Sequence, residues 1–178
     1  MQDADLFMEL AGIAGVFVGF GALIAVRGGG PDETWGIASI GLVVMGGAQV
    51  IVLALAPVAI GRFAIPDHVA WVSCSVLFLV VFWVLGEVLD RLFPERMAMR
   101  TAWPMQARWR SEVLGLVVLV PMHLALVAIL LGVAPDADAA LYFGALVLLL
   151  LMDVAMLLYV VVSGGRRPSA TWQGPGKQ

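Results

Sequence analysis

The sequence predicts an all-α, polytopic integral membrane protein: a bundle of five transmembrane helices with the N-terminus outside and the C-terminus inside. The class follows from composition, because 62% of the 178 residues are hydrophobic and 13% are charged, whereas soluble domains carry about a quarter charged residues. The direction follows from the distribution of basic residues between the apolar runs. Helices are expected because an open sheet cannot satisfy its backbone hydrogen bonds in lipid.

Five apolar runs are long enough to cross the hydrocarbon, which takes about 20 helical residues. They lie at about residues 7–26, 36–61, 69–91, 112–133 and 139–162. The stretch before the first run is acidic rather than basic, so we expect that run to remain in the mature protein and not to be a cleaved signal peptide. Residues 1–163 then form one transmembrane domain, and the Gly/Pro-rich residues 164–178 form a disordered cytoplasmic tail.

Nine of the ten basic residues fall on one side of a five-crossing chain. One side carries Arg62 together with the acids Asp3, Asp5, Glu9, Asp67, Asp136 and Asp138. The other side carries the remaining basic residues, which are Arg27, Arg91, Arg96, Arg100, Arg108, Arg110, Arg166, Arg167 and Lys177. The positive-inside rule makes this second side cytoplasmic, in a bacterial-type inner membrane. The arginines lie where anionic lipid headgroups would be, so the lipid bilayer is the expected partner and nucleic acid is not.

The longest connection, residues 93–110, mixes arginines with methionines and tryptophans and is divided by Pro104. This pattern predicts an amphipathic segment that lies on the cytoplasmic leaflet. A gate or a docking surface for a partner is the functional alternative.

Small residues line one face of the first predicted helix. Gly12, Gly15, Gly19 and Ala22 follow one another at helical spacing. Such a face lets another backbone approach closely, and close approach drives helix association in lipid. It indicates either packing within the monomer or the seam of a homo-oligomer.

Four polar side chains lie within the predicted spans: Gln49, Glu87, His123 and Asp153. Ionisable groups in hydrocarbon are unfavourable unless they are paired or hydrated, so each requires a reason. Asp153 is the most informative, because it is flanked on both sides by apolar residues and is too short to reach the interface. It must be protonated, paired or in contact with water.

His123 lies at a similar depth to Asp153 when both are counted from the cytoplasmic arginines. The two spans are joined by a short loop, so a His–Asp contact is plausible, and its proton occupancy could change near neutral pH. Pro121 is expected to bend the helix beside His123, and Pro57 to distort the second span. These polar residues have three interpretations. They could form a polar contact that only holds helices together, a proton or ion path, or a ligand pocket.

Glu87 stands four residues before Arg91, a spacing that suits an intrahelical ion pair. Its functional alternative is a carboxylate at the cytoplasmic mouth of a path. Gln49 lies near the middle of the second span, where it can bond a neighbouring helix or line a polar lumen.

The chain lacks the sequence signatures of hydrolases, metalloproteases and nucleotide-binding loops, and its one cysteine, Cys74, stands within an apolar run. We therefore expect no enzyme activity, no cofactor and no metal site. The leading hypothesis is a small homo-oligomeric channel or proton-linked permeation protein that uses Asp153 and His123. One alternative is a non-conducting structural or accessory subunit, and another is a lipid- or small-molecule-binding membrane protein.

Overall fold

A computed structural model of the chain describes residues 4–27, 34–63, 65–92 and 105–164. All regular structure in these ranges is helical. The elements are α1 (Ala4–Arg27), α2 (Thr34–Ile60), α3 (Asp67–Leu92), α5 (Met105–Leu130), the 3₁₀ turn η1 (Pro135–Ala137) and α6 (Asp138–Gly164). The prediction of an all-α chain is thereby confirmed. Residues 93–104, which form the first part of the predicted amphipathic segment 93–110, and the tail from 165 onward lie outside the described residues.

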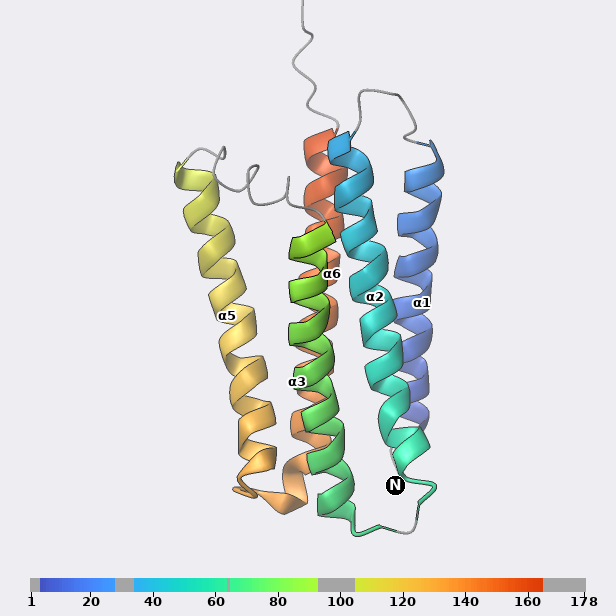
Figure 1. Ribbon diagram of the computed structural model, residues 1–178, viewed down its shortest axis with the longest axis vertical. Coiled ribbons are helices and arrows are strands. Elements are labelled where there is room, and N and C mark those ends of the chain that lie inside the picture. Colours follow the sequence, from blue (N-terminus) through green and yellow to red (C-terminus); the bar gives the residue numbers. More distant parts are fainter. Residues whose placement is uncertain (1–3, 28–33, 64, 93–104, 165–178) are drawn as a thin grey trace, which may run out of the picture.

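The five long helices run alternately up and down and form one bundle (Figure 1). Helix α6 is at its centre and contacts each of the other four, while α1 packs mainly on α2, and α5 on α6 and α3. We call the end where α1, α3 and α6 begin the His68 end, and the opposite end the Arg91 end. Residues far apart in sequence therefore meet across α6.

Helix α5 begins at Met105, directly after Pro104, rather than near residue 112. Part of the predicted surface segment, Met105–Arg110, is thus the first turns of this helix. The other four helices agree with the predicted spans to within three residues at each end. The apolar pattern located the spans but not the polar turns that extend α5 beyond them.

Gly132 ends α5 earlier than the apolar run ends. It adopts φ 62°, a conformation that residues with a side chain rarely take. The amide of Gly132 bonds the carbonyl of Ile129 at 3.1 Å, and that of Val133 bonds the carbonyl of Ala128 at 3.1 Å. This is a Schellman closure, which satisfies the last carbonyls of a helix. Helix α5 therefore ends at Leu130, whereas the sequence predicted a span that continues to residue 133.

An aromatic cluster fills the core towards the His68 end. The ring of Tyr142 in α6 lies 5.7 Å from Trp71, 5.9 Å from Phe78 and 6.1 Å from Phe7, between ring centroids. These rings come from α1, α3 and α6, and the pairs are tilted or edge-on, as the charge distribution of aromatic rings favours. The cluster fixes the three helices against one another.

The hydroxyl of Tyr142 also closes a gap in α2. Pro57 has no N–H, so the carbonyl of Leu53 loses its helical donor. Tyr142 donates a hydrogen bond to that carbonyl at 2.9 Å, in a fully buried position. Pro57 was predicted to distort the second span, and it does lie inside α2. The freed carbonyl is satisfied from α6.

Replacing Tyr142 with phenylalanine should lower the free energy of unfolding in detergent by about 1–2 kcal/mol, since a buried acceptor loses its donor. In a Pro57→Ala background the backbone supplies that donor again, so the same replacement should cost clearly less. Unfolding of the four proteins, followed by circular dichroism, measures the coupling. Equal losses in both backgrounds would contradict this role of Tyr142.

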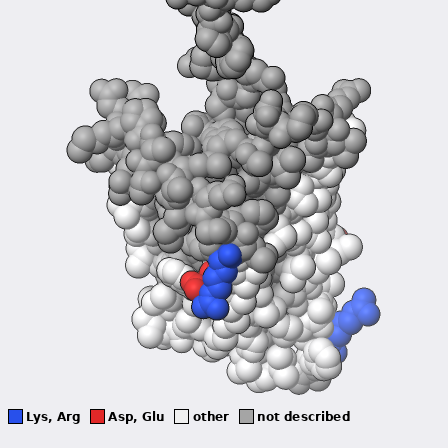
Figure 2. Space-filling view, turned by 45° about the horizontal axis from the view of Figure 1, so that its top comes forward, with Lys and Arg blue, Asp and Glu red and all other residues white. Residues whose placement is uncertain are grey.

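The surface of the bundle is that of a membrane protein. Three helical stretches in the described ranges are long and apolar enough to cross a membrane: Ala4–Leu23, Asp67–Val88 and Pro135–Leu158. Two shorter apolar stretches, Val44–Ile60 and Gly115–Leu130, accompany them. Large apolar side chains such as Leu116, Leu124 and Leu131 are exposed. In the part of Figure 2 that is not grey, few charged side chains interrupt a broad uncharged surface. Lipid is the medium in which such a surface is favourable.

Most of the small-residue face of α1 does not pack inside the bundle; of its four residues only Gly15 is partly buried, with Ile51 Cδ1 of α2 4.0 Å from an added Cβ. Gly12, Gly19 and Ala22 are exposed, and a Cβ added at Gly12 or Gly19 would meet nothing within 4 Å. Helix α1 instead approaches α2 where Gly47 lies against Val18, whose Cγ2 would be 2.6 Å from a Cβ at residue 47. Packing within the monomer therefore uses mainly a different face from the one that the glycine spacing marks.

Candidate functional site

Asp153 lies inside the bundle, about 22 Å along α6 from its first residue. Its carboxyl group rests directly on the backbone of Gly46 in α2. A Cβ added at Gly46 would fall 2.7 Å from Asp153 Cγ and 2.8 Å from Oδ2, closer than real side chains approach. Only glycine leaves room there, so residue 46 shapes the site as much as the aspartate does.

The Oδ2 atom of Asp153 is buried, and no described protein group bonds it. One turn along α2 from Gly46, Gln49 is 8% exposed, and its Nε2 is also buried without a partner among the described residues. Natural proteins pair almost all such atoms, and an exception marks a strained, functional or hydrated position. Helices α2 and α6 thus each carry a buried polar side chain, an amide and an acid respectively, with unused hydrogen-bonding capacity.

His123 lies in a different interface. Its ring is edge-on to Phe82 and Trp83 of α3, with centroids 5.5 and 5.9 Å away. Its Nδ1–H donates to the carbonyl of Leu119 at 2.8 Å. A carbonyl only accepts, so this contact places a proton on Nδ1. The other ring nitrogen, Nε2, is buried and has no partner in the described part of the chain.

The structure therefore does not bring His123 and Asp153 together. Because Gly132 ends α5 early, His123 is about 10 Å from the end of its helix, whereas Asp153 is about 22 Å from the start of the next one. The two side chains also face different neighbours, α3 and α2 respectively. Counting from the cytoplasmic arginines gave matching depths, because it treated two helices as aligned that are offset at the turn.

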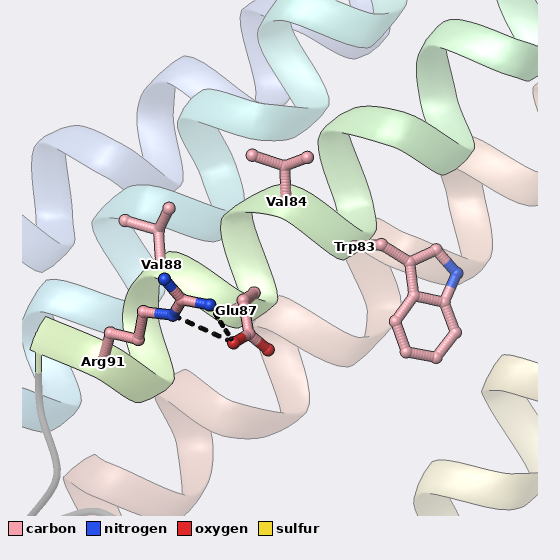
Figure 3. Close-up of a pocket in the computed structure, with 5 residues that line it drawn as sticks. All are labelled: Trp83, Val84, Glu87, Val88 and Arg91. Atoms are coloured by element: carbon pink, nitrogen blue, oxygen red, sulfur yellow. Dashed lines mark hydrogen bonds and ion pairs between the residues drawn. The ribbon is translucent and has the colours of Figure 1, made fainter.

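Glu87 forms the predicted ion pair with Arg91. The Nε and Nη2 atoms of the arginine each lie 3.0 Å from Glu87 Oε1. Both side chains are exposed, and with Trp83, Val84 and Val88 they line a shallow surface hollow of about 400 Å³ near the Arg91 end (Figure 3). An exposed pair of this kind adds little stability. The acid is on the surface of α3 and not inside the bundle.

Pro121 is exposed, as is Val117, whose carbonyl lacks a helical donor because of it. Unlike Pro57, Pro121 therefore acts on the outer side of its helix. Cys74 is free and buried. No three His, Cys, Asp or Glu side chains gather into a metal-binding group in the described ranges.

A buried polar contact that sequence reasoning missed joins α3 to α6 at the His68 end. Nδ1 of His68 lies 2.6 Å from Oδ2 of Asp138, whose side chain is 1% exposed. The imidazole also lies against the turn at Gly132, 3.5 Å from the position of a Cβ there. The signal was present in the sequence, because each residue directly precedes a predicted span, 69–91 or 139–162, on the same side of the predicted topology.

Replacing His68 with alanine should lower the free energy of unfolding by about 1–3 kcal/mol, since it leaves a buried carboxyl unpaired. Replacing Arg91 with alanine, which breaks an exposed pair, should cost about 0.5 kcal/mol or less. Thermal unfolding of both variants in the same detergent compares them. If the two losses are equal, the His68–Asp138 contact is no more important than a surface pair.

Comparisons with protein-family models, with curated proteins and with solved structures found no match to this chain. What the site does must therefore be argued from its own chemistry. Two apolar helices carry an acid and an amide, each with a buried atom that no described residue bonds, and a glycine leaves space for the acid.

Proposed function

We propose that the protein is a small membrane permeation protein, of the channel or proton-linked type, and that Asp153 is the group that binds the permeating cation. The observation that supports this is the carboxyl of Asp153, held in the apolar interior against Gly46 with its Oδ2 unbonded by the described residues. Ionisable groups at such depth are unfavourable and usually mark a path for protons or ions.

Gln49 is the natural second contact on this path. It lies on the α2 face that includes Gly46, one turn nearer the His68 end. An amide can both accept and donate, so it can orient a water or a hydrated ion beside the acid. His123 belongs to this proposal only through a rearrangement, since α3 holds its ring in the described state.

The proposed topology has five crossings of a bacterial-type inner membrane, with the His68 end outside. It rests on the positive-inside rule: with five crossings, nine of the ten basic residues, Arg91 among them, belong to the side of the Arg91 end, and Arg62 alone belongs to the side of the His68 end. The proposal includes a homo-oligomer, and the open face at Gly12 and Gly19 is the surface that suits close contact between copies.

Flux into liposomes tests the proposal. Purified protein in liposomes that contain a pH-sensitive dye should carry protons at a rate above that of empty liposomes, and the Asp153→Asn variant should fall to the empty rate. The Glu87→Gln variant is the matched control, because it removes an exposed acid and should retain most of the flux. Unchanged flux in the Asp153→Asn variant would remove the proposal.

A non-conducting accessory subunit is the second candidate. The open small-residue face of α1 favours it, because that face suits a foreign helix as well as a second copy. Purification in mild detergent separates the two cases. A stoichiometric foreign partner with no flux favours the accessory subunit, and a homo-oligomer with flux favours the permeation protein.

A further inference from the structure

The surroundings of Asp153 bear on which cation the site accepts. A metal ion in a protein takes about six oxygen ligands, and those ligands must be grouped around one point. A proton needs a single acceptor atom. The number of oxygen-bearing side chains near Asp153 therefore separates the two classes of cargo.

The described side chains offer Asp153 few such ligands. On α2 the carboxyl rests on Gly46, which has no side chain, and the polar side chain one turn further along that helix is Gln49, which has one amide oxygen. On α6 its neighbours within one turn are apolar: Leu149, Leu150, Val154, Met156 and Leu157. The close contact with Gly46 also covers one face of the carboxyl, where an ion would have to be coordinated.

The titratable and charged groups on the other helices face elsewhere. On α3, Cys74 is in the core cluster, His68 bonds Asp138, and Glu87 pairs with Arg91 on the surface. On α5, His123 bonds its own helix and packs on α3. On α1, Asp5 and Glu9 are exposed near the His68 end. Among the residues whose side chains the structure describes, no second charged group faces Asp153.

From this geometry we infer that the cargo of the Asp153 site is the proton itself and not a metal cation. The inference rests on the proposed permeation function and narrows its cargo. A hydronium ion delivers its proton to the Asp153 carboxylate, an O–H bond forms, and one water molecule leaves. The reverse transfer to water on the other side releases the proton and restores the carboxylate.

A hydrophobic carbodiimide tests this inference without measuring flux. The reagent reacts with a protonated carboxyl in an apolar site: the carboxyl oxygen adds to the central carbon, the proton moves to nitrogen, and rearrangement leaves a stable N-acylurea. The whole reagent is retained, so mass spectrometry of the peptide that contains Asp153 shows the addition. We expect labelling at acidic pH, its loss at alkaline pH, and no protection by sodium, potassium or calcium.

Infrared difference spectra give a second readout that does not require the reagent to enter. A protonated carboxyl absorbs apart from a carboxylate, so the wild-type protein minus its Asp153→Asn variant should show a carboxyl band that disappears with rising pH and is unchanged by metal salts. Protection from the reagent, or displacement of the band, by a metal cation would overturn the inference. So would the absence of both label and band at acidic pH. Labelling without flux would instead leave the proton site in place and remove the permeation function.

Discussion

The Gly46→Ala variant should be destabilised by about 2 kcal/mol relative to wild type. A Cβ at residue 46 would collide with three atoms of the Asp153 carboxyl, two of them at 2.7 and 2.8 Å. Overpacking of this kind typically costs about 1–3 kcal/mol and sometimes more. The gain of about 1 kcal/mol in helix propensity on replacing a helical glycine with alanine offsets only part of that cost.

Gly144 provides the matched control on the opposite helix. A Cβ at Gly144 would meet nothing within 4 Å, so Gly144→Ala should leave stability unchanged or raise it by up to about 1 kcal/mol through helix propensity. Unfolding of both variants in one detergent gives the comparison. Opposite signs support the packing of Asp153 on Gly46, whereas a harmless Gly46→Ala substitution would show that the carboxyl does not rest there.

The Asp153→Leu variant should be at least as stable as wild type and more stable by up to about 3 kcal/mol, while its proton flux is lost. Leucine has the branched shape of aspartate, and an apolar group of similar shape in place of a buried polar one is often neutral or stabilising. Asp153 has no described hydrogen-bond partner on Oδ2 to lose.

The sign of the stability change in the Asp153→Leu variant distinguishes a functional role of Asp153 from a structural one. If the role of Asp153 were to stabilise the packing of α6 on α2 through a polar contact, the leucine variant would lose that contact and its unfolding temperature would fall. A gain in stability together with a loss of flux is the pattern expected of a residue retained for activity at the expense of stability. Circular dichroism and the liposome assay on the same preparation measure both properties.

Sequence periodicity was sufficient for the helical class and for the approximate bounds of the long helices, and it showed that Asp153 stands alone among apolar residues. It was not sufficient for the partners of the polar residues. The rotation of each helix about its axis depends on packing, and glycines such as Gly46 and Gly47 determine it through contacts with single side chains in other helices. The sequence marks both as small and does not indicate which neighbour each one meets.

Helix ends account for the other differences. Helix α5 ends at Leu130 rather than at residue 133, and this adds about 4–5 Å to the offset between His123 and Asp153, because each residue adds about 1.5 Å along a helix. The contact between His68 and Asp138 joins the first turns of α3 and α6, where polar side chains interrupt the apolar periodicity. The sequence contains both Tyr142 and Pro57, but only the fold shows that the Tyr142 hydroxyl supplies the hydrogen-bond donor that Pro57 lacks.

The most direct test is the ratio of proton flux in the Asp153→Asn variant to that in the wild type, at equal protein per liposome. A carboxyl buried against Gly46 without a counter-ion among the described side chains should have a transport role, so the ratio should fall to the level of empty liposomes. A ratio of one, with both proteins folded, would contradict the account.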